Sequence, residues 1–356
     1  MIRKNKGEWS ELYALFRLLD QGKIYAADNK LKKIDDIYFP IIKIIREESI
    51  KKIVDYTIDE NNKTIKIFLN NSHIKDIPME TFRIEADELL KNIKIGGQRA
   101  FEIESTENFM QKIYCEKVTA KSSDKTDITM QIKDVQTGYS PVCGFSIKSE
   151  LGMPPTLLNA SRATNFIYKI DGLNKNDVKK INEITTGNKI QKRMEYLFEC
   201  ADVEFLETEN VITNENLLLL DSKLPDILAE ALLVHFRDGI SKCTDIIGKL
   251  EYDNPLGFPD GGYYEFKFKK FLCAVALGMK PSVRWNGRDE ANGGYIVITK
   301  DGDVLAYHIY NRNYFEDYLL YNTKFEKAST TRHGYASVYN EENEYRIKLN
   351  LQIRFI

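Results

Sequence analysis

Three polar side chains occupy positions where two neighbouring strands could bring them together. In residues 127–132 polar and apolar side chains alternate, which predicts a strand whose polar face begins at Asp127. Residues 142–148 have the pattern of a second strand, with Ser146 and Lys148 on one face. The residues between the two stretches favour a turn, so an antiparallel hairpin is expected. A carboxylate and a lysine placed in this way could catalyse metal-assisted hydrolysis of a phosphodiester.

The chemistry requires carboxylates that hold Mg²⁺ against a phosphate oxygen and a lysine that positions or activates water. Asp127 and Lys148 are separated by roughly twenty residues, which is ample for a hairpin connection. An ordinary solvated strand face would show the same alternation, so the spacing alone leaves both interpretations open.

A second set of residues has the literal residue types for this chemistry. Asp260 is followed by Glu265 and Lys267. Only about four residues separate the two acids, which is tight for two distinct strands. This set is therefore an alternative site, to be tested after the first.

The first set resembles the PD-(D/E)xK nuclease pattern, with two departures. Lys125 and Thr126 precede the first acid, and Ser146 stands where the second acid is expected. The second departure removes a metal ligand. Some restriction enzymes of that superfamily also have a serine there and recruit a carboxylate from elsewhere in the chain.

Three glutamates could supply the missing carboxylate. Glu150 follows the lysine, and Glu8 and Glu11 lie about one turn apart on a predicted N-terminal helix. Glu11 is the favoured candidate.

A wider set of segments is similar to the HpaII-type restriction endonucleases. The resemblance extends over almost the whole chain. Its segments are KGEWSE at 6–11, GFSIKSELG at 144–152, PTLLNAS at 155–161, TNF at 164–166, YHIYNRN at 307–313, FEDYL at 315–319 and KLNLQI at 348–353.

The resemblance implies a type II enzyme that cuts both strands of a short palindrome in double-stranded DNA, CCGG for this family, with Mg²⁺ as cofactor. It implies that Asp127, the backbone carbonyl of Ile147 and Glu11 hold the metal, and that Lys148 assists the attacking water. It also implies a cognate DNA methyltransferase that forms no stable complex with the enzyme. A palindromic site favours a homodimer on DNA, although monomers can cut such sites.

Two other functions stay open at this point. The absence of an acid at Ser146 allows a sequence-specific DNA-binding protein without catalysis, and the same superfamily contains repair nucleases.

Polar loops supply the residue types that read DNA. Arginine can bind guanine O6 and N7 together, and polar groups near the catalytic strand suit phosphate contacts. Arg288 and Arg312 are the strongest candidates for base contacts, although ordinary turn chemistry would also account for such loops. The full set of expected DNA contacts is Ser161, Asn165, Arg288, Asn311, Arg312 and Arg332.

The remaining pattern predicts a mixed α/β (α+β) fold in which helices flank a mixed-sheet PD-(D/E)xK nuclease core. Residues 8–19, 79–93 and 224–236 have helical periodicity, with Asn174 or Asn176 as the cap of another helix, and 295–299 with 304–310 form a hairpin pattern. Residues 1–172 are expected to form the catalytic core with its N-terminal helix. Residues 173–250 would be a helical insertion, and residues 251–356 an α+β, β-rich DNA-recognition region.

Composition narrows the class of protein without identifying it. The 356 residues are 43% hydrophobic, and 51 Lys and Arg balance 53 Asp and Glu to a net charge of −2, so a DNA partner would need a local basic surface. The five cysteines lie far apart and are expected to be buried thiols, and His235 is expected to be a core histidine. The start has no signal-peptide pattern and no stretch is long enough for a membrane span, which favours a cytoplasmic protein.

Overall fold

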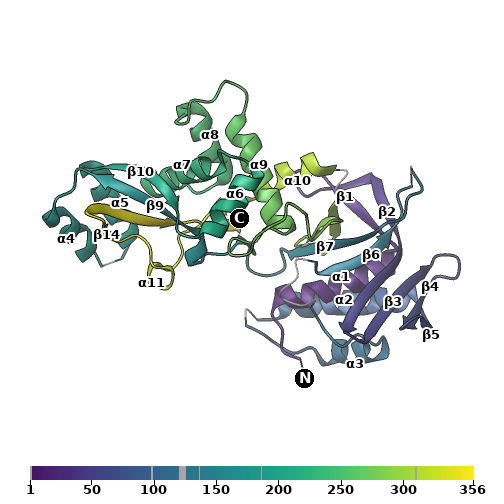
Figure 1. The fold of residues 1–356 in the computed structure, drawn as a ribbon. Coiled ribbons are helices and arrows are strands. Elements are labelled where there is room, and N and C mark those ends of the chain that lie inside the picture. Colours follow the sequence, from purple (N-terminus) through teal and green to yellow (C-terminus); the bar gives the residue numbers. More distant parts are fainter. Residues whose placement is uncertain (1, 98, 120–125, 136, 186, 309–310) are drawn as a thin grey trace. The chain divides into compact units, whose positions relative to one another are not determined.

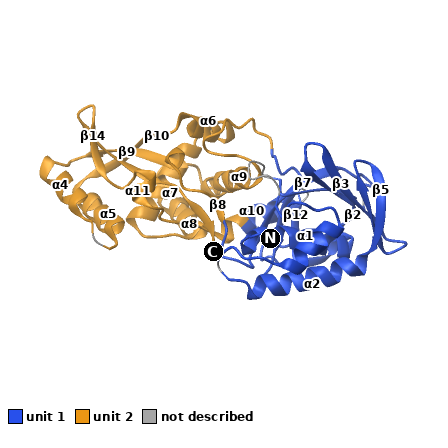
Figure 2. Cartoon of the chain, turned by 90° about the horizontal axis from the view of Figure 1, so that it is seen from below, with its two compact units in different colours: residues 1–155, 289–318 blue, residues 156–288, 319–356 orange. Residues whose placement is uncertain are grey.

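The computed structural model describes residues 2–97, 99–119, 126–135, 137–185, 187–308 and 311–356. The chain divides into two compact units (Figure 2). Unit 1 comprises Met1–Pro155 and Asp289–Tyr318, and unit 2 comprises Thr156–Arg288 and Leu319–Ile356. Residues 156–172 of the predicted core therefore lie in unit 2, and residues 289–318 of the predicted C-terminal region lie in unit 1. The division into a catalytic core, a helical insertion and a DNA-recognition region stays a prediction.

A nine-stranded sheet of parallel and antiparallel strands forms the centre of unit 1 (Figure 1). Its order is β1-β12-β11-β7-β6-β2-β3-β4-β5, and β1 also pairs with β2. The strands are β1 (Lys23–Ala27), β2 (Lys33–Ser49), β3 (Lys52–Asp59), β4 (Thr64–Leu69), β5 (Ser72–Pro78), β6 (Ile128–Ile132), β7 (Val142–Ser149), β11 (Gly294–Ile298) and β12 (Val304–His308). The predicted mixed α and β class is confirmed.

The predicted N-terminal helix is α1 (Lys6–Gln21), and nine of its residues are buried. Asn5 caps its start by accepting from the Glu8 N–H, and the Glu8 side chain accepts from the Asn5 N–H. Gly22 ends the helix in the left-handed conformation that glycine adopts easily. The helix packs against α2 (Met79–Ile95), while α3 (Glu104–Lys112) also contacts α2.

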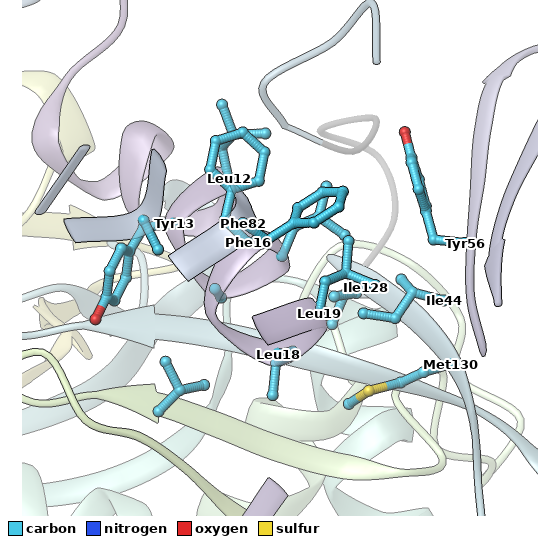
Figure 3. Close-up of a cluster of buried hydrophobic side chains, with 14 of the residues drawn as sticks. Leu12, Tyr13, Phe16, Leu18, Leu19, Ile44, Tyr56, Phe82, Ile128 and Met130 are labelled. Atoms are coloured by element: carbon cyan, nitrogen blue, oxygen red, sulfur yellow. The ribbon is translucent and has the colours of Figure 1, made fainter. Parts of the chain in front are cut away.

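Apolar side chains from α1, α2 and the sheet form one core (Figure 3). Phe16 meets Phe82 and Phe109 edge to face, with ring centroids 6.3 and 5.2 Å apart. From the sheet, Ile128 and Met130 of β6 join the same cluster. The apolar half of the alternating strand pattern thus faces α1, so the polar half faces the opposite side.

The hairpin that carries the catalytic pattern is present. β6 and β7 pair antiparallel with Ile128 opposite Phe145, and β7 pairs on its other edge with β11 in parallel. The second predicted hairpin is β11–β12, of which residues 304–308 are described and residues 309–310 lie outside the described part. The two hairpins lie side by side in one sheet although the chain leaves unit 1 between them.

Unit 2 combines two small sheets with six helices and two short helical turns among its described residues. The sheets have the orders β10-β9-β15-β14 and β13-β16-β8, and α7 is nearly all buried. The strands are β8 (Thr156–Leu158), β9 (Asn165–Asp171), β10 (Asp202–Thr208), β13 (Thr323–Phe325), β14 (Val338–Glu341), β15 (Glu344–Asn350) and β16 (Ile353–Phe355). The helical segments are η1 (Arg162–Thr164), α4 (Lys175–Glu183), α5 (Lys189–Cys200), α6 (Val211–Leu220), α7 (Leu224–Arg237), α8 (Cys243–Asp253), α9 (Tyr263–Leu277) and α11 (Thr330–His333), together with the last turn of α10 (Arg312–Tyr321).

Several smaller expectations can be compared with the structure. Asn174 is the cap of α4, and His235 is buried with its Nδ1 2.6 Å from the Ile240 carbonyl oxygen. The prediction that all five cysteines are buried is wrong at Cys200, which lies exposed at the end of α5. None of the helices in the described residues is long and apolar enough to cross a membrane.

Candidate active site

Asp127 lies where the β6–β7 ladder ends, and its side chain extends that ladder. Its backbone N–H donates to the Phe145 carbonyl at 2.9 Å. Its carboxylate Oδ2 accepts the Ile147 N–H at 2.6 Å and the Ser146 hydroxyl at 3.2 Å. Hydrogen bonds to an ionised carboxylate are short and strong, so this pair holds the carboxylate against β7.

The backbone carbonyl of Ile147 points toward the same side as Asp127. Backbone groups alternate between the two edges of a strand. Gly144 and Glu150 bond to the β11 side, and Phe145 and Ile147 bond to the Asp127 side. The predicted carbonyl ligand and the predicted carboxylate ligand are therefore on one edge of β7.

Lys148 and Glu11 line one cavity of about 630 Å³, formed where the start of α1 meets the end of β7. Glu8 also lines it, but both of its carboxylate oxygens have local partners. Oε1 accepts from the Lys4 ammonium at 2.8 Å, and Oε2 accepts from the Asn5 N–H at 2.9 Å. Glu8 thus helps to cap the start of α1, and Glu11 of the same helix lines the cavity together with Lys148.

Asp127 lines a second cavity, of about 530 Å³, on the polar face of the sheet. Glu47, Glu290 and Asn292 contribute to the same lining. The structure therefore places Asp127 in one cavity and Lys148 in another, and the Ile147 backbone connects them through its bond to the Asp127 carboxylate.

The donor set suits a hard divalent cation, because carboxylate and carbonyl oxygens are the ligands that Mg²⁺ prefers. In the part of the chain that the structure describes, no three His, Cys, Asp or Glu side chains gather closely enough to share an ion. Asp127 and Glu11 line separate cavities, so the expectation that both hold one ion stays a prediction.

A loop before β11 braces the start of the site, and the sequence analysis did not identify it. The Asn292 side-chain oxygen accepts the Gly144 N–H at 2.9 Å, and the Thr126 hydroxyl donates to the Glu290 carbonyl at 3.0 Å. A Cβ atom at Gly293 would lie 2.6 Å from the Phe145 ring, so only glycine allows this approach. The adjacent pair Gly293-Gly294 was the available sequence signal. Of the two residues before Asp127 that depart from the superfamily pattern, Lys125 lies outside the described residues.

The alternative acid and lysine set does not form a strand site. Glu265 and Lys267 lie on helix α9. Lys267 is paired with Asp221, and Glu265 with Lys269. The helix places these side chains in ion pairs of unit 2, so the set offers no facing strands for the expected chemistry.

Arg288 is exposed on a tightly bonded turn. Its N–H donates to the Asn286 side chain at 3.0 Å, and its carbonyl accepts from the Trp285 indole at 2.9 Å. The buried Asn216 of α6 holds the same loop through the Val283 carbonyl and the Trp285 N–H, both at 2.8 Å. The backbone of this loop is anchored while the Arg288 side chain stays available.

The other expected base contacts differ in how far their side chains are already bonded or buried within the protein. The Arg312 guanidinium bonds to Glu316 at 3.2 Å and lies 4.0 Å from Asp289. Burial raises the pKa of the Asp289 carboxyl, and the charge of Arg312 opposes that rise. Asn311 is half-buried just before α10, and Arg332 is exposed on α11.

The expected phosphate contacts fall at a structural junction of unit 2. Asn165 is completely buried, and its amide donates to the Glu209 carboxylate at 2.6 Å and the His333 carbonyl at 2.9 Å. Asn350 donates to the Asn165 side-chain oxygen at 2.6 Å and to the Ser161 carbonyl at 2.8 Å. Asn165 is therefore best explained as an internal bracing residue and not as a phosphate contact, whereas Ser161 is half-buried.

Comparison with known proteins gives one family. The model of the HpaII restriction endonuclease family matches residues 5–355. The chain is 42% identical to the type II restriction enzyme HpaII of Haemophilus parainfluenzae, over 99% of this chain and 98% of the relative. No solved structure matches.

Proposed function

The chain belongs to the HpaII restriction endonuclease family, and from that premise we propose that it cuts both strands of double-stranded DNA at CCGG. The observation that carries the proposal is the 42% identity to a type II restriction enzyme over 99% of the chain. Because the family match runs from residue 5 to residue 355, it includes Asp127, Lys148 and both compact units.

We propose that Mg²⁺ is the cofactor and that Asp127, the Ile147 carbonyl and Glu11 would hold it. Bound Mg²⁺ would polarise a phosphate oxygen and lower the pKa of a bound water. The oxygen donors and the shared edge of Asp127 and Ile147 support this assignment. Ser146 contributes its hydroxyl to the orientation of Asp127 rather than a ligand charge.

Lys148 is the proposed positioning group for the attacking water and for the charge that develops on the phosphate. It is half-buried and lines the cavity at the end of β7, which Glu11 also lines. A lysine ammonium is a compact point charge with three donors, which suits both tasks. The proposal that Asp127 and Lys148 act in one site is supported by the Ile147 backbone, which precedes Lys148 and bonds to the Asp127 carboxylate.

Arg288 is the proposed reader of guanine, because its side chain is exposed on an anchored loop. Asn311, Arg312 and Arg332 are proposed as further DNA contacts, and Ser161 as a phosphate contact. We also propose a homodimer on the palindrome, a separate methyltransferase that protects host DNA, and action in the cytoplasm where that DNA lies.

Digestion of phage DNA of known sequence by the purified full chain tests the function. With Mg²⁺ we expect discrete fragments whose ends map to CCGG, and with EDTA in place of Mg²⁺ we expect none. Specific binding to CCGG without cutting would favour the non-catalytic DNA-binding protein. Cutting without discrete fragments would favour a repair nuclease, and ends at another sequence would refute CCGG.

A further inference from the structure

A buried ion pair of β2 bonds to one short backbone segment of the loop after α3. The Arg46 guanidinium donates to the Glu48 carboxylate at 2.8 Å, and Glu48 is 1% exposed. Arg46 also donates to the Lys117 carbonyl at 2.6 Å. The other Glu48 oxygen accepts the Glu116 N–H at 3.0 Å and the Lys117 N–H at 2.9 Å. Both backbone groups of Lys117 are therefore bonded to this ion pair.

The position of the ion pair in β2 shows that it does more than fill space. Ile44, Arg46 and Glu48 occupy alternate positions of the strand, and Ile44 belongs to the apolar core of unit 1. Replacing a buried ion pair by apolar side chains is often neutral or stabilising, so stability alone does not account for the pair. Its hydrogen bonds to residues 116 and 117 give it a definite task, which is to fix the backbone of this loop.

The residue after Lys117 anchors the same segment in the core. Val118 is 2% exposed and belongs to the apolar cluster of unit 1. Lys117 and Thr119, on either side of it, line the cavity that contains Asp127. The anchored segment thus presents an ammonium and a hydroxyl to that cavity. Both are groups that donate hydrogen bonds to phosphate oxygens in protein–DNA complexes.

The cavity around Asp127 has a surplus of negative charge. Its described lining contains three acids and two cations, namely Glu47, Asp127 and Glu290 with Arg46 and Lys117. Arg46 is already paired with Glu48. A DNA phosphate that approaches Asp127 is repelled by the acids, and a cation offsets this repulsion. Within the described lining, Lys117 is the cation that remains for this task.

We propose that Lys117 binds a phosphate of the DNA backbone beside Asp127, and that the Arg46–Glu48 ion pair holds Lys117 in place for this contact. The proposal rests on the proposed nuclease function and deepens it, because it names a contact to the substrate in the Asp127 cavity. Thr119 supplies a second donor to the same phosphate. Such a contact fixes the position of DNA without reading its sequence.

The test measures how the DNA affinity of the full-length protein depends on salt concentration. Each phosphate contact releases bound counterions, so the logarithm of the binding constant falls with the logarithm of salt concentration by about 0.9 per contact. Lys117→Gln removes the charge of this half-buried side chain, and Lys117→Arg keeps it. Lys112→Gln is the matched control, because Lys112 is exposed at the end of α3 and lies outside the lining of the Asp127 cavity.

Gel shifts between about 50 and 200 mM KCl, with Ca²⁺ in place of Mg²⁺, give the slope on duplexes with and without CCGG. For Lys117→Gln we expect a slope that is shallower by about one unit and a similar loss of affinity on both duplexes. Lys117→Arg and Lys112→Gln should keep the slope of the wild type.

A wild-type slope in Lys117→Gln would overturn the proposal. So would a loss confined to the CCGG duplex, which would indicate a base contact, and so would an equal loss in Lys117→Arg or Lys112→Gln, which would indicate a general effect on structure or charge. The phage DNA digest reports separately on the nuclease function: a wild type that binds DNA but does not cut refutes that function and leaves the comparison of slopes decisive for Lys117.

Discussion

The backbone N–H of Ile147 donates a hydrogen bond of 2.6 Å to the carboxylate of Asp127. The bond joins the residue directly before β6 to β7, one residue before Lys148. The carboxylate is thereby held on the edge of β7 toward which the Ile147 carbonyl also points. A shift of β7 by one residue would reverse the faces of Ser146 and Lys148, so this bond also stabilises the register that the chemistry needs.

Lys148→Ala should abolish cleavage while leaving specific DNA binding largely intact. Loss of a group that positions or activates water costs about 10²- to 10⁴-fold in rate. Single-turnover cleavage of a CCGG duplex with Mg²⁺, together with gel-shift binding in Ca²⁺, measures the two properties. Lys267→Ala is the control. Lys267 lies on α9 and is paired with Asp221, so its replacement should leave the rate unchanged. Normal cleavage by Lys148→Ala would show that the site is misassigned.

Glu11→Gln and Glu8→Gln should separate metal binding from helix capping. Glu11→Gln is expected to slow cleavage by about 10-fold to 100-fold and raise the Mg²⁺ concentration needed, because a ligand charge is lost. Glu8→Gln should lower the free energy of unfolding by about 1 kcal/mol through the capping box and leave the Mg²⁺ dependence unchanged. Titrations of Mg²⁺ and urea measure these effects. The reverse pattern would assign the metal to Glu8.

Arg288→Ala should weaken binding to CCGG by about 1–3 kcal/mol, the range for losing a bidentate contact to guanine. Arg312→Ala should have a smaller effect, because Arg312 is already bonded to Glu316. Competition binding against duplexes with one base pair changed measures affinity and specificity together. A loss for Arg288→Ala that is equal on all sequences would indicate a phosphate contact instead.

Acid should destabilise the fold through its buried histidines. Burial lowers the pKa of His235 and of His308 to about 4, from an ordinary value of 6.5. A histidine with a lowered folded pKa contributes its full stability above pH 6.5, and that contribution is lost as the pH falls toward 4. For His235 the loss at pH 5 is roughly 2 kcal/mol.

The measurement is urea unfolding between pH 7.5 and pH 4.5, for the wild type and two variants. His235→Leu should flatten the pH dependence because it removes one titrating group. Leu232→Ala on the same helix is the control, because it removes buried apolar contacts and no titrating group, so it should lower stability to a similar extent at every pH. An unchanged slope in His235→Leu would contradict the role of His235.

The sequence by itself determined the local structure of the site and the family. The period-two alternation in β6 and β7 and the helical period in α1 are local patterns, so they can be recognised without knowing the contacts across the fold. The helix start at Asn5 and Glu8 is equally local, because both capping bonds lie within four residues. The segments around Ser146 and Lys148 indicated the family, and the comparison over residues 5–355 confirmed it.

Only the tertiary structure decided which polar side chains are buried or bonded to distant parts of the chain. Alternation cannot show that Asn165 is buried by Asn350 or that Ser146 has Tyr295 beside it, since those partners come from distant parts of the chain. Burial and pairing with a distant strand depend on how elements pack, and only the folded chain brings Asp127 to Ile147 and Tyr295 to Ser146.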